Sequence, residues 1–465
     1  MPKKITFDLG RTSIPLTLPE SADILYMGKT VQLSNPKQAI LNALHNPIDT
    51  QPLQDAVRHI LQNNLKAKAV IVISDNTRPV PYKGEQGILY PIINEMVMVG
   101  LPPSRIQILV ANGIHHPLGE MELKKILPPE IFSFGIEIIN HNSRDIQDLI
   151  PIGRTKIGGE ILVNRHYMDA DIKILTGLVE SHFMSGVSGG RKAICPGLMA
   201  EKSIHILHGG NILNSPFARD LVLDNNPVHE EALNVARMAG CDMIVNVTLD
   251  PKYNLTGVFA GDMESAHKAA VKKLHEYATI PVKKQYDIVV THSGFVGINH
   301  YQTAKAATVA ANIIKPGGYC ILSSHHSDID PIGSNDYRKM LRLLKEKGTD
   351  GYLKMILADE WLFVPDQWEP QMWTRLFNVI PQENLLYCTF EIPQEDFSWM
   401  PGTDARKLAP QAKSPQELTE KSLNWGIEAY RDKTGGNPQI AVLRDGPYGI
   451  PVTVHHNGQK IKKQP

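Results

Sequence analysis

The sequence has few cysteines, no net charge and no long apolar run, and each absence excludes a class of protein. Only four of its 465 residues are cysteine, and they lie too far apart for a zinc-binding spacing or a convincing disulfide framework. Its 48 basic residues balance 48 acidic ones, so charge gives no reason to expect nucleic acid or an anionic membrane as a partner. No apolar stretch is long enough to cross a bilayer, and "MPKKITFDLG" at the start lacks the apolar core of a signal peptide. We therefore expect a soluble, reduced, cytoplasmic protein.

Short apolar runs rich in β-branched residues recur along the chain and alternate with helical patterns. Apolar runs of this length, bounded by helices, are typical of buried parallel strands. The alternation predicts an α/β fold with parallel-rich, doubly wound sheets. The predicted strands occupy residues 69–74, 106–112, 171–177, 242–250, 287–294 and 319–324.

Polar and charged side chains cluster where these predicted strands end. Asp75 and Arg78 follow the first strand, His115 follows the second and His182 follows the third. In open α/β sheets, ligands bind outside the carboxyl ends of the strands. Polar loops alone would explain asparagine, serine and glycine there, but they explain the repeated histidine, arginine and lysine less well.

The chain changes character near residues 277–287, where a helical pattern gives way to a strand through a proline and two lysines. We place a domain boundary there. The prediction is two α/β domains, one over residues 1–279 and one over residues 280–465.

The stretch "ESHFMSGVSGGRKAICPG", residues 180–197, combines a glycine-rich loop with a lysine. Glycines permit positive φ, and successive backbone amides can form a nest for an anion. Ala193 follows Lys192 where a Walker A loop needs serine or threonine, and the dinucleotide fingerprint is absent too. From the residues alone, Lys192 is an anion contact, a nucleophile or a solvated side chain on a flexible turn.

Three further patterns leave two interpretations each. His205 and His208 are three residues apart, so a helix would place them near one face, where imidazole suits nickel, copper or zinc. Two helical histidines without a third ligand are more often structural or solvated. Gln302 and Lys305 share the same spacing and either bind an anionic group or form a solvated first turn. Trp368 either packs in the core or covers a cofactor plane.

The order of the motifs is more specific than any one of them. "SDNTRPVP", "ILVANGIHHP", "ESHFMSGVSGGRKAICPG", "HGG…NSP", "FAGD", "YQTAK" and "PDQW" follow one another with a spacing that resembles the lactate racemase family. The resemblance covers most of the chain. It implies a nickel-pincer enzyme, built of two α/β domains with the active site in the cleft between them, that racemises or epimerises 2-hydroxy acids.

The resemblance also implies a role for particular residues. Lys192 matches the lysine that covalently holds a pyridinium-3,5-dithiocarboxylic-type mononucleotide, the nickel-pincer nucleotide, and His208 matches the protein ligand of its nickel. His115 and His182 match the two catalytic histidines. Cofactor contacts are expected from Asp75, Arg78, Gly189, Gly190 and Trp368, and substrate contacts from Arg78, Tyr301, Gln302 and Lys305.

The implied chemistry is reversible hydride transfer. The C2 hydrogen of a 2-hydroxy acid is a poor acid because the neighbouring carboxylate is already anionic. Transfer of this hydrogen as a hydride to an electron-poor pyridinium is easier than its removal as a proton, and it leaves a 2-keto acid. Opposite enantiomers present their hydroxyls from opposite sides, which makes two bases useful. Met184 and Val187 stand where bulkier aromatics are expected in lactate-specific members, and "SSHHSDIDPIGSND" replaces an expected glycine-rich loop. We therefore expect a substrate larger or more polar than lactate.

Two other classes of function stay open at this point. Lys192 as a Schiff-base lysine for a pyridoxal-type cofactor, or a zinc site made from His115, His182 and His208, would indicate a lyase or hydrolase. A non-catalytic, anion-binding α/β protein would need none of these histidines for binding. The racemase interpretation adds partners: a 2-hydroxy acid and the cofactor-synthesis proteins that supply the pincer and nickel, with no nucleic acid and no membrane.

Overall fold

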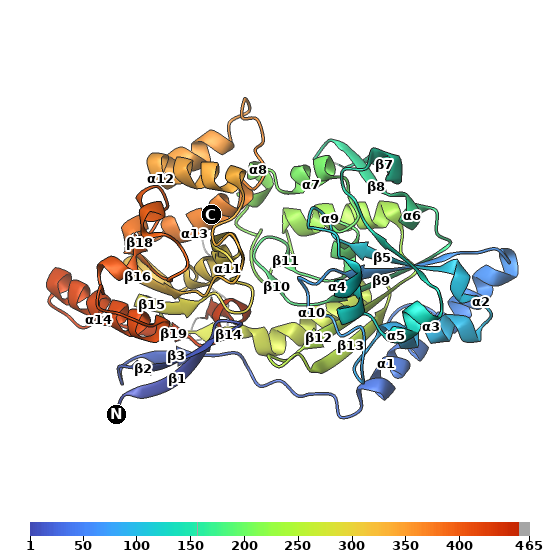
Figure 1. Cartoon of the computed structure of the whole chain (residues 1–465), viewed down its shortest axis with the longest axis horizontal. Helices are drawn as coiled ribbons and strands as arrows, with labels where there is room; N and C mark the ends of the chain where they lie inside the picture. Colours follow the sequence, from blue (N-terminus) through green and yellow to red (C-terminus); the bar gives the residue numbers. More distant parts are fainter. Residues whose placement is uncertain (156, 455–465) are drawn as a thin grey trace. The chain divides into compact units, whose positions relative to one another are not determined.

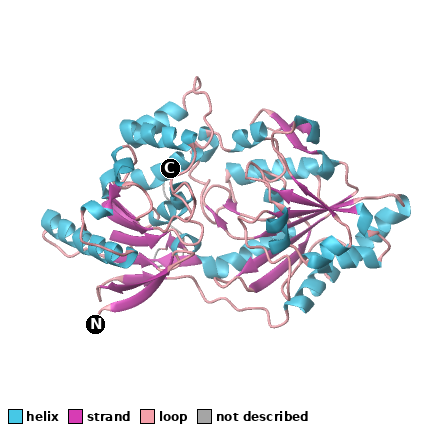
Figure 2. Ribbon diagram, in the orientation of Figure 1, coloured by secondary structure: helices cyan, strands magenta, loops and turns pink. Residues whose placement is uncertain are grey.

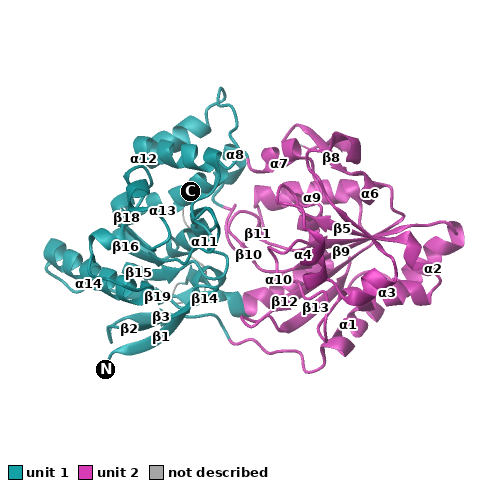
Figure 3. Ribbon diagram, viewed as in Figure 1, with its two compact units in different colours: residues 1–28, 209–216, 277–465 teal, residues 29–208, 217–276 magenta. Residues whose placement is uncertain are grey.

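A computed structural model describes residues 1–155 and 157–454, which divide into two units (Figure 3). Unit 1 comprises residues 1–28, 209–216 and 277–465, and unit 2 comprises residues 29–208 and 217–276. The chain changes unit at residue 277, close to the boundary predicted after residue 279. The two units differ from the predicted domains in two segments, because residues 1–28 and 209–216 belong to unit 1.

Unit 2 is built on a six-stranded sheet whose strand order is β13-β12-β9-β4-β5-β6 (Figure 1). Every neighbouring pair is parallel except β12 with β13, which is antiparallel. The strands are β4 (Ala69–Ser74), β5 (Ile106–Ala111), β6 (Glu137–Asn140), β9 (Ile172–Leu178), β12 (Met243–Leu249) and β13 (Leu255–Gly261).

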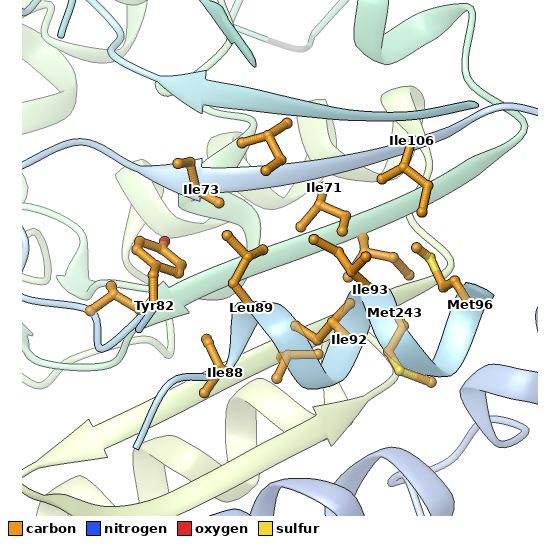
Figure 4. Close-up of a cluster of buried hydrophobic side chains, with 14 of the residues drawn as sticks. Ile71, Ile73, Tyr82, Ile88, Leu89, Ile92, Ile93, Met96, Ile106 and Met243 are labelled. Carbon is orange, nitrogen blue, oxygen red and sulfur yellow. The ribbon is translucent and has the colours of Figure 1, made fainter. Parts of the chain in front are cut away.

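Strand β4 shows why the apolar runs are continuous rather than alternating. Ile71 and Ile73 face a cluster of side chains that includes Ile92 and Ile93 of helix α3 (Leu89–Met98), as Figure 4 shows. Val70 and Val72 belong to a second cluster that lies on the opposite face of the sheet. Successive strand side chains point to opposite faces, so a strand covered on both faces needs apolar residues at every position.

Unit 1 contains a second six-stranded sheet with the order β18-β17-β16-β15-β19-β3, and all of its neighbouring pairs are parallel. The predicted α/β class with parallel-rich sheets is therefore confirmed in both units. The strands are β3 (Asp23–Leu25), β15 (Tyr286–His292), β16 (Ile314–Ser323), β17 (Leu385–Cys388), β18 (Thr403–Asp404) and β19 (Ile440–Leu443).

Helices and two-stranded sheets complete the two units (Figure 2). The two-stranded pairs are β1 (Lys3–Asp8) with β2 (Ser13–Leu18), β7 (Leu149–Arg154) with β8 (Glu160–Asn164), β10 (Ser181–His182) with β11 (Gly186–Val187), and β14 (Thr279–Val282) with β20 (Ile450–Thr453). The other helices are α1 (Pro36–His45), α2 (Leu53–Asn63), α4 (Glu120–Ile126), α5 (Pro129–Ser133), α6 (Arg165–Met168), α7 (Glu201–Leu207), α8 (Gly210–Leu213), α9 (Pro227–Ala239), α10 (Ser265–Ala278), α11 (His300–Ala310), α12 (Asn335–Ile356), α13 (Trp368–Phe377) and α14 (Pro415–Thr434). Within the described ranges, no helix is both long and apolar enough to cross a membrane.

His141 is a buried neutral histidine that ties three segments of unit 2 together. Its Nε2 lies 2.9 Å from the carbonyl oxygen of Met199, and its Nδ1 lies 3.1 Å from the amide nitrogen of Asn164. The carbonyl can only accept, so Nε2 carries the hydrogen and Nδ1 accepts. Burial lowers the pKa of His141 to about 4. The folded state therefore resists a protonation that the unfolded chain accepts near pH 6.5.

This difference predicts an acid-sensitive contribution to stability. The contribution is complete above the unfolded pKa and is lost as the pH falls toward the folded value, because only the unfolded chain gains the proton. Between about pH 7.5 and about pH 5, the His141 term should lower the free energy of unfolding by about 2 kcal/mol. Urea unfolding of the apoprotein at both pH values measures it. His141→Gln should lose this part of the pH dependence, whereas the same change at exposed His59 should keep it, and equal pH dependence in all three proteins would contradict the assignment.

Candidate active site

The sheet of unit 2 has a topological switch point between β4 and β9. From β4 the chain proceeds outward to β5 and β6, and then returns to the other side of β4 to form β9 and β12. Ligands of open α/β sheets bind outside the carboxyl ends of the strands at such a point. Asp75 and Arg78 follow β4, His115 follows β5, and His182 follows β9, so the fold gathers all four at this edge.

Asp75 and His115 form a close pair across the ends of β4 and β5. The His115 Nδ1 atom lies 2.7 Å from Asp75 Oδ2, and the other carboxylate oxygen accepts from the Thr77 backbone and hydroxyl. Burial opposes ionisation of Asp75, which is 5% exposed, but the hydrogen bonds from His115 and Thr77 outweigh it, so the pKa of Asp75 lies below its usual value. The His115 side chain is 52% exposed. A buried carboxylate thus orients an imidazole that remains accessible.

Arg78 and Glu180 form the second pair at this edge, directly across the switch point. The Arg78 Nε atom lies 2.9 Å from Glu180 Oε1, and both side chains are partly buried. The contact links the loop after β4 to the segment after β9. Sequence reasoning did not single out Glu180, although it stands two residues before His182 in the quoted motif.

His182 lies in the β10–β11 hairpin, which the chain forms just after β9 (Figure 1). Its Nδ1 accepts from the backbone N–H groups of Met184 and Ser185, at 3.3 and 3.2 Å. The buried Asn226 links this hairpin to helix α9. Its amide nitrogen donates to the Met184 carbonyl oxygen at 3.0 Å, and its amide oxygen caps the N-terminus of α9. Asn226 was also missed, since nothing in the sequence connects it to a hairpin about forty residues earlier.

The glycine-rich loop before Lys192 has a geometry that only glycine adopts without strain. Gly189 and Gly190 have φ values of +77° and +51°. A Cβ atom at Gly189 would lie 2.7 Å from a Val179 methyl and 2.8 Å from Asn246 Oδ1, which itself accepts the Gly190 N–H at 2.7 Å. The loop therefore lies tightly against the ends of β9 and β12, and any larger residue would displace it.

The side chains of Arg191 and Lys192 both reach Ser185, but at different oxygen atoms. Arg191 is 1% exposed, and its guanidinium donates to the carbonyl oxygens of Ser185 at 2.9 Å and Gly189 at 3.3 Å. These two hydrogen bonds hold the backbone of the glycine-rich loop in place. The Lys192 amine lies 3.4 Å from the Ser185 hydroxyl and is close enough to His208 for its charge to lower the pKa of that imidazole.

His208 is held as a neutral imidazole at the C-terminal end of α7. Its Nδ1 lies 2.9 Å from the Ile204 carbonyl oxygen, which can only accept, so Nδ1 carries the hydrogen and Nε2 has the lone pair. Burial first, and then the neighbouring Lys192 charge, lower the pKa of His208 to about 4. A neutral imidazole with its tautomer fixed by a backbone carbonyl is the state that binds a transition metal. Within the described residues, no group of three or more His, Cys, Asp or Glu side chains is placed to hold a metal ion.

The predicted residues of unit 1 form one cluster at the start of helices α11 and α13. Trp368 donates from its indole nitrogen to the Tyr301 hydroxyl at 2.6 Å, and Lys305 donates to the Gln302 side chain at 2.7 Å. Gln302 and Lys305 lie on a helix, as their spacing predicted. Glu369, beside Trp368, is 4% exposed, and burial raises its pKa well above the usual value although Lys305 opposes this. Sequence reasoning missed this buried acid.

The predicted site residues fall into two groups, one in each unit. Unit 2 brings together Asp75 with His115 and Lys192 with His208, and it places His182 in a hairpin joined by backbone to the Lys192 loop. This arrangement can orient a carboxylate, move a proton at an imidazole and present an amine next to a metal-competent histidine.

Comparisons with known proteins point the same way. A family model described as the lactate racemase N-terminal domain matches residues 9–220. Lactate racemase from Lactiplantibacillus plantarum is 33% identical over 359 residues, which cover 76% of this chain and 81% of that protein. Lactate racemase from Thermoanaerobacterium thermosaccharolyticum is 31% identical over 379 residues, 80% of this chain and 83% of that protein.

Solved structures extend the likeness to the fold. The lactate racemase apoprotein from Thermoanaerobacterium thermosaccharolyticum matches with a TM-score of 0.81 and 27% identity, over 97% of this chain and 100% of that chain. A protein from Thermotoga maritima matches with a TM-score of 0.56 and 15% identity, over 88% of this chain and 99% of that one, and shares the fold alone.

Proposed function

The chain belongs to the lactate racemase family, and from that premise we propose that it inverts C2 of a 2-hydroxy acid by reversible hydride transfer through a 2-keto acid. The observation that carries the proposal is the pairing of His115 with the buried carboxylate of Asp75 at the switch point of the sheet, 2.7 Å apart. A base held in one orientation by an ionised acid is what removal of a hydroxyl proton requires.

The cofactor of this proposal is a nickel-pincer nucleotide. Lys192 would hold it covalently, His208 would bind its nickel, and Gly189 and Gly190 would contact it through their backbone. The residues fit such a group, because His208 is neutral with Nε2 as its lone-pair nitrogen and lies near the Lys192 amine. When bound, the group supplies an electron-poor carbon that accepts and returns a hydride. Proteins that synthesise the cofactor would supply it, so expression without them should yield apoprotein.

The chain's own residues handle the proton and the charge. His115 takes the hydroxyl proton at Nε2, and Asp75 stabilises the resulting imidazolium. Arg78 binds the substrate carboxylate through its guanidinium. The ion pair between Arg78 Nε and Glu180 holds this guanidinium in place. His182 acts on a hydroxyl presented from the other side, as the enantiomer requires.

We extend the proposal to four residues of unit 1. Tyr301, Gln302 and Lys305 would bind substrate, and Trp368 would contact the cofactor, as the family resemblance implies. Their mutual hydrogen bonds support a preorganised cluster rather than four independent side chains.

The substrate is proposed to be larger or more polar than lactate. Met184 and Val187, which replace the expected aromatics, are both buried in the hairpin that carries His182.

A panel of chiral 2-hydroxy acids tests the activity and the substrate class together. We expect nickel-loaded holoenzyme to racemise several of them, with larger or more polar acids turned over faster than lactate, measured by chiral chromatography. Turnover of lactate alone would overturn the proposed substrate class. Absence of turnover with every acid, from protein whose adduct and nickel are verified, would overturn the racemase itself.

A further inference from the structure

The two candidate catalytic histidines differ in which ring nitrogen carries the hydrogen. In neutral imidazole one nitrogen is a donor and the other is an acceptor, and a fixed partner at one nitrogen determines the state of the other. Both His115 and His182 have such a partner at Nδ1, but the two partners are of opposite kind.

His115 has an acceptor at Nδ1. The partner is Asp75 Oδ2 at 2.7 Å, on a carboxylate whose pKa lies below its usual value and which is therefore ionised at neutral pH. An ionised carboxylate can only accept, so Nδ1 must carry the hydrogen. The lone pair of neutral His115 is consequently at Nε2, and a proton added there gives an imidazolium that Asp75 stabilises.

His182 has donors at Nδ1. The backbone N–H groups of Met184 and Ser185 both point at this nitrogen, at 3.3 and 3.2 Å. A backbone N–H can only donate, so Nδ1 must hold the lone pair and Nε2 must carry the hydrogen. A hydrogen at Nδ1 would lie against the two backbone hydrogens that already point at this nitrogen.

We propose that Asp75 and the Met184–Ser185 turn hold His115 and His182 in opposite tautomers, which makes His115 the resting base and His182 the resting hydrogen-bond donor. The roles rest on the proposed racemase function, whereas the tautomers do not. Asp75 is then a positioning residue, and so is the hairpin turn.

The proton balance of each histidine follows from its tautomer. His115 gains a proton at Nε2 when the substrate hydroxyl loses one, with no other change at the ring. His182 can accept a proton at Nε2 only after its ring hydrogen has moved to Nδ1, and that requires the Met184 and Ser185 N–H groups to release Nδ1. Inversion in the direction that uses His182 as the base therefore requires a rearrangement of the turn, and the other direction does not.

Nitrogen-15 NMR of apoprotein labelled at histidine tests the tautomers without cofactor, substrate or turnover. Ring nitrogens with and without a hydrogen have well-separated shifts, and mildly alkaline buffer keeps ordinary imidazoles neutral. Single His→Gln variants assign the two rings. We expect His115 with its hydrogen at Nδ1 and His182 with its hydrogen at Nε2. The same tautomer at both positions, or an even mixture at His182, would overturn the proposal.

Asp75→Asn changes the residue that fixes the His115 tautomer and leaves the Met184–Ser185 turn, which fixes the His182 tautomer, unchanged. The amide can donate as well as accept, so we expect the Nε2-hydrogen tautomer to become populated at His115 while the His182 signals stay where they are. Glu180→Gln is the matched control, because this carboxylate at the same sheet edge pairs with Arg78, and neither tautomer should change. Loss of the Nδ1 preference at His115 in both variants would show that Asp75 is not its cause. Far-ultraviolet circular dichroism checks that each variant is folded, and wild-type spectra decide the tautomers even if a variant is not.

Discussion

Replacing Lys192 by arginine is expected to leave the protein without a covalent adduct and without detectable racemisation. Arginine keeps the positive charge beside His208, so any loss comes from the missing amine nucleophile rather than from electrostatics. Intact mass of protein from a host that supplies cofactor and nickel measures the adduct. The tryptic peptide that contains residue 192 locates it in the wild type.

Lys202→Arg is the matched control, since Lys202 is exposed on α7, the helix whose C-cap residue is His208. It should keep the adduct, the nickel content and the activity. An adduct of unchanged mass on the Lys192→Arg protein would place the attachment elsewhere. Zinc in place of nickel, or a pyridoxal-type adduct on Lys192, would favour the lyase or hydrolase alternatives.

Replacing His115 by asparagine is expected to lower kcat by roughly 10²- to 10⁴-fold, the usual contribution of a positioned acid–base group. Nickel and adduct content should stay at wild-type levels, because His208 and Lys192 are untouched. KM should change much less than kcat, since carboxylate binding is assigned to Arg78. Steady-state kinetics on holoenzyme, normalised to nickel, measures both quantities.

His116→Asn provides a close control for this experiment. His116 is adjacent in sequence and also exposed, but the imidazole that pairs with the Asp75 carboxylate is that of His115. We expect near wild-type kcat for this variant. Equal losses at the two positions would mean that the loop, rather than the His115 imidazole, determines the rate.

Sequence reasoning located the strands well because burial on both faces leaves a strong local signal. The run at residues 69–74 coincides with β4, since Ala69 to Ile73 are all buried and apolar. The same reasoning could not place β3 (Asp23–Leu25), a three-residue strand whose partner is β19 at the far end of the chain. Short length and distant pairing remove the local signal.

The site was partly predictable for a related reason. Polar residues at strand ends indicated Asp75, Arg78, His115 and His182, because parallel strands bring their carboxyl ends to one edge. The pairing of Asp75 with His115 depends on strand order and register, which one sequence does not reveal. Asn226 and Asn246 were out of reach, because single asparagines that bond a distant backbone have no motif.

The pairing of β3 with β19 has a consequence for how the protein is made. Residues 23–25 leave the ribosome long before residue 440, yet the strand they pair with in the sheet is β19, which begins at that residue. Domains tend to fold as their segments emerge, and contacts between distant segments form slowly. The last strand of the unit 2 sheet ends at residue 261, so this sheet can assemble on the nascent chain before β19, the partner of β3, has been synthesised. The order of synthesis thus favours folding of the unit 2 sheet before the unit 1 sheet is complete.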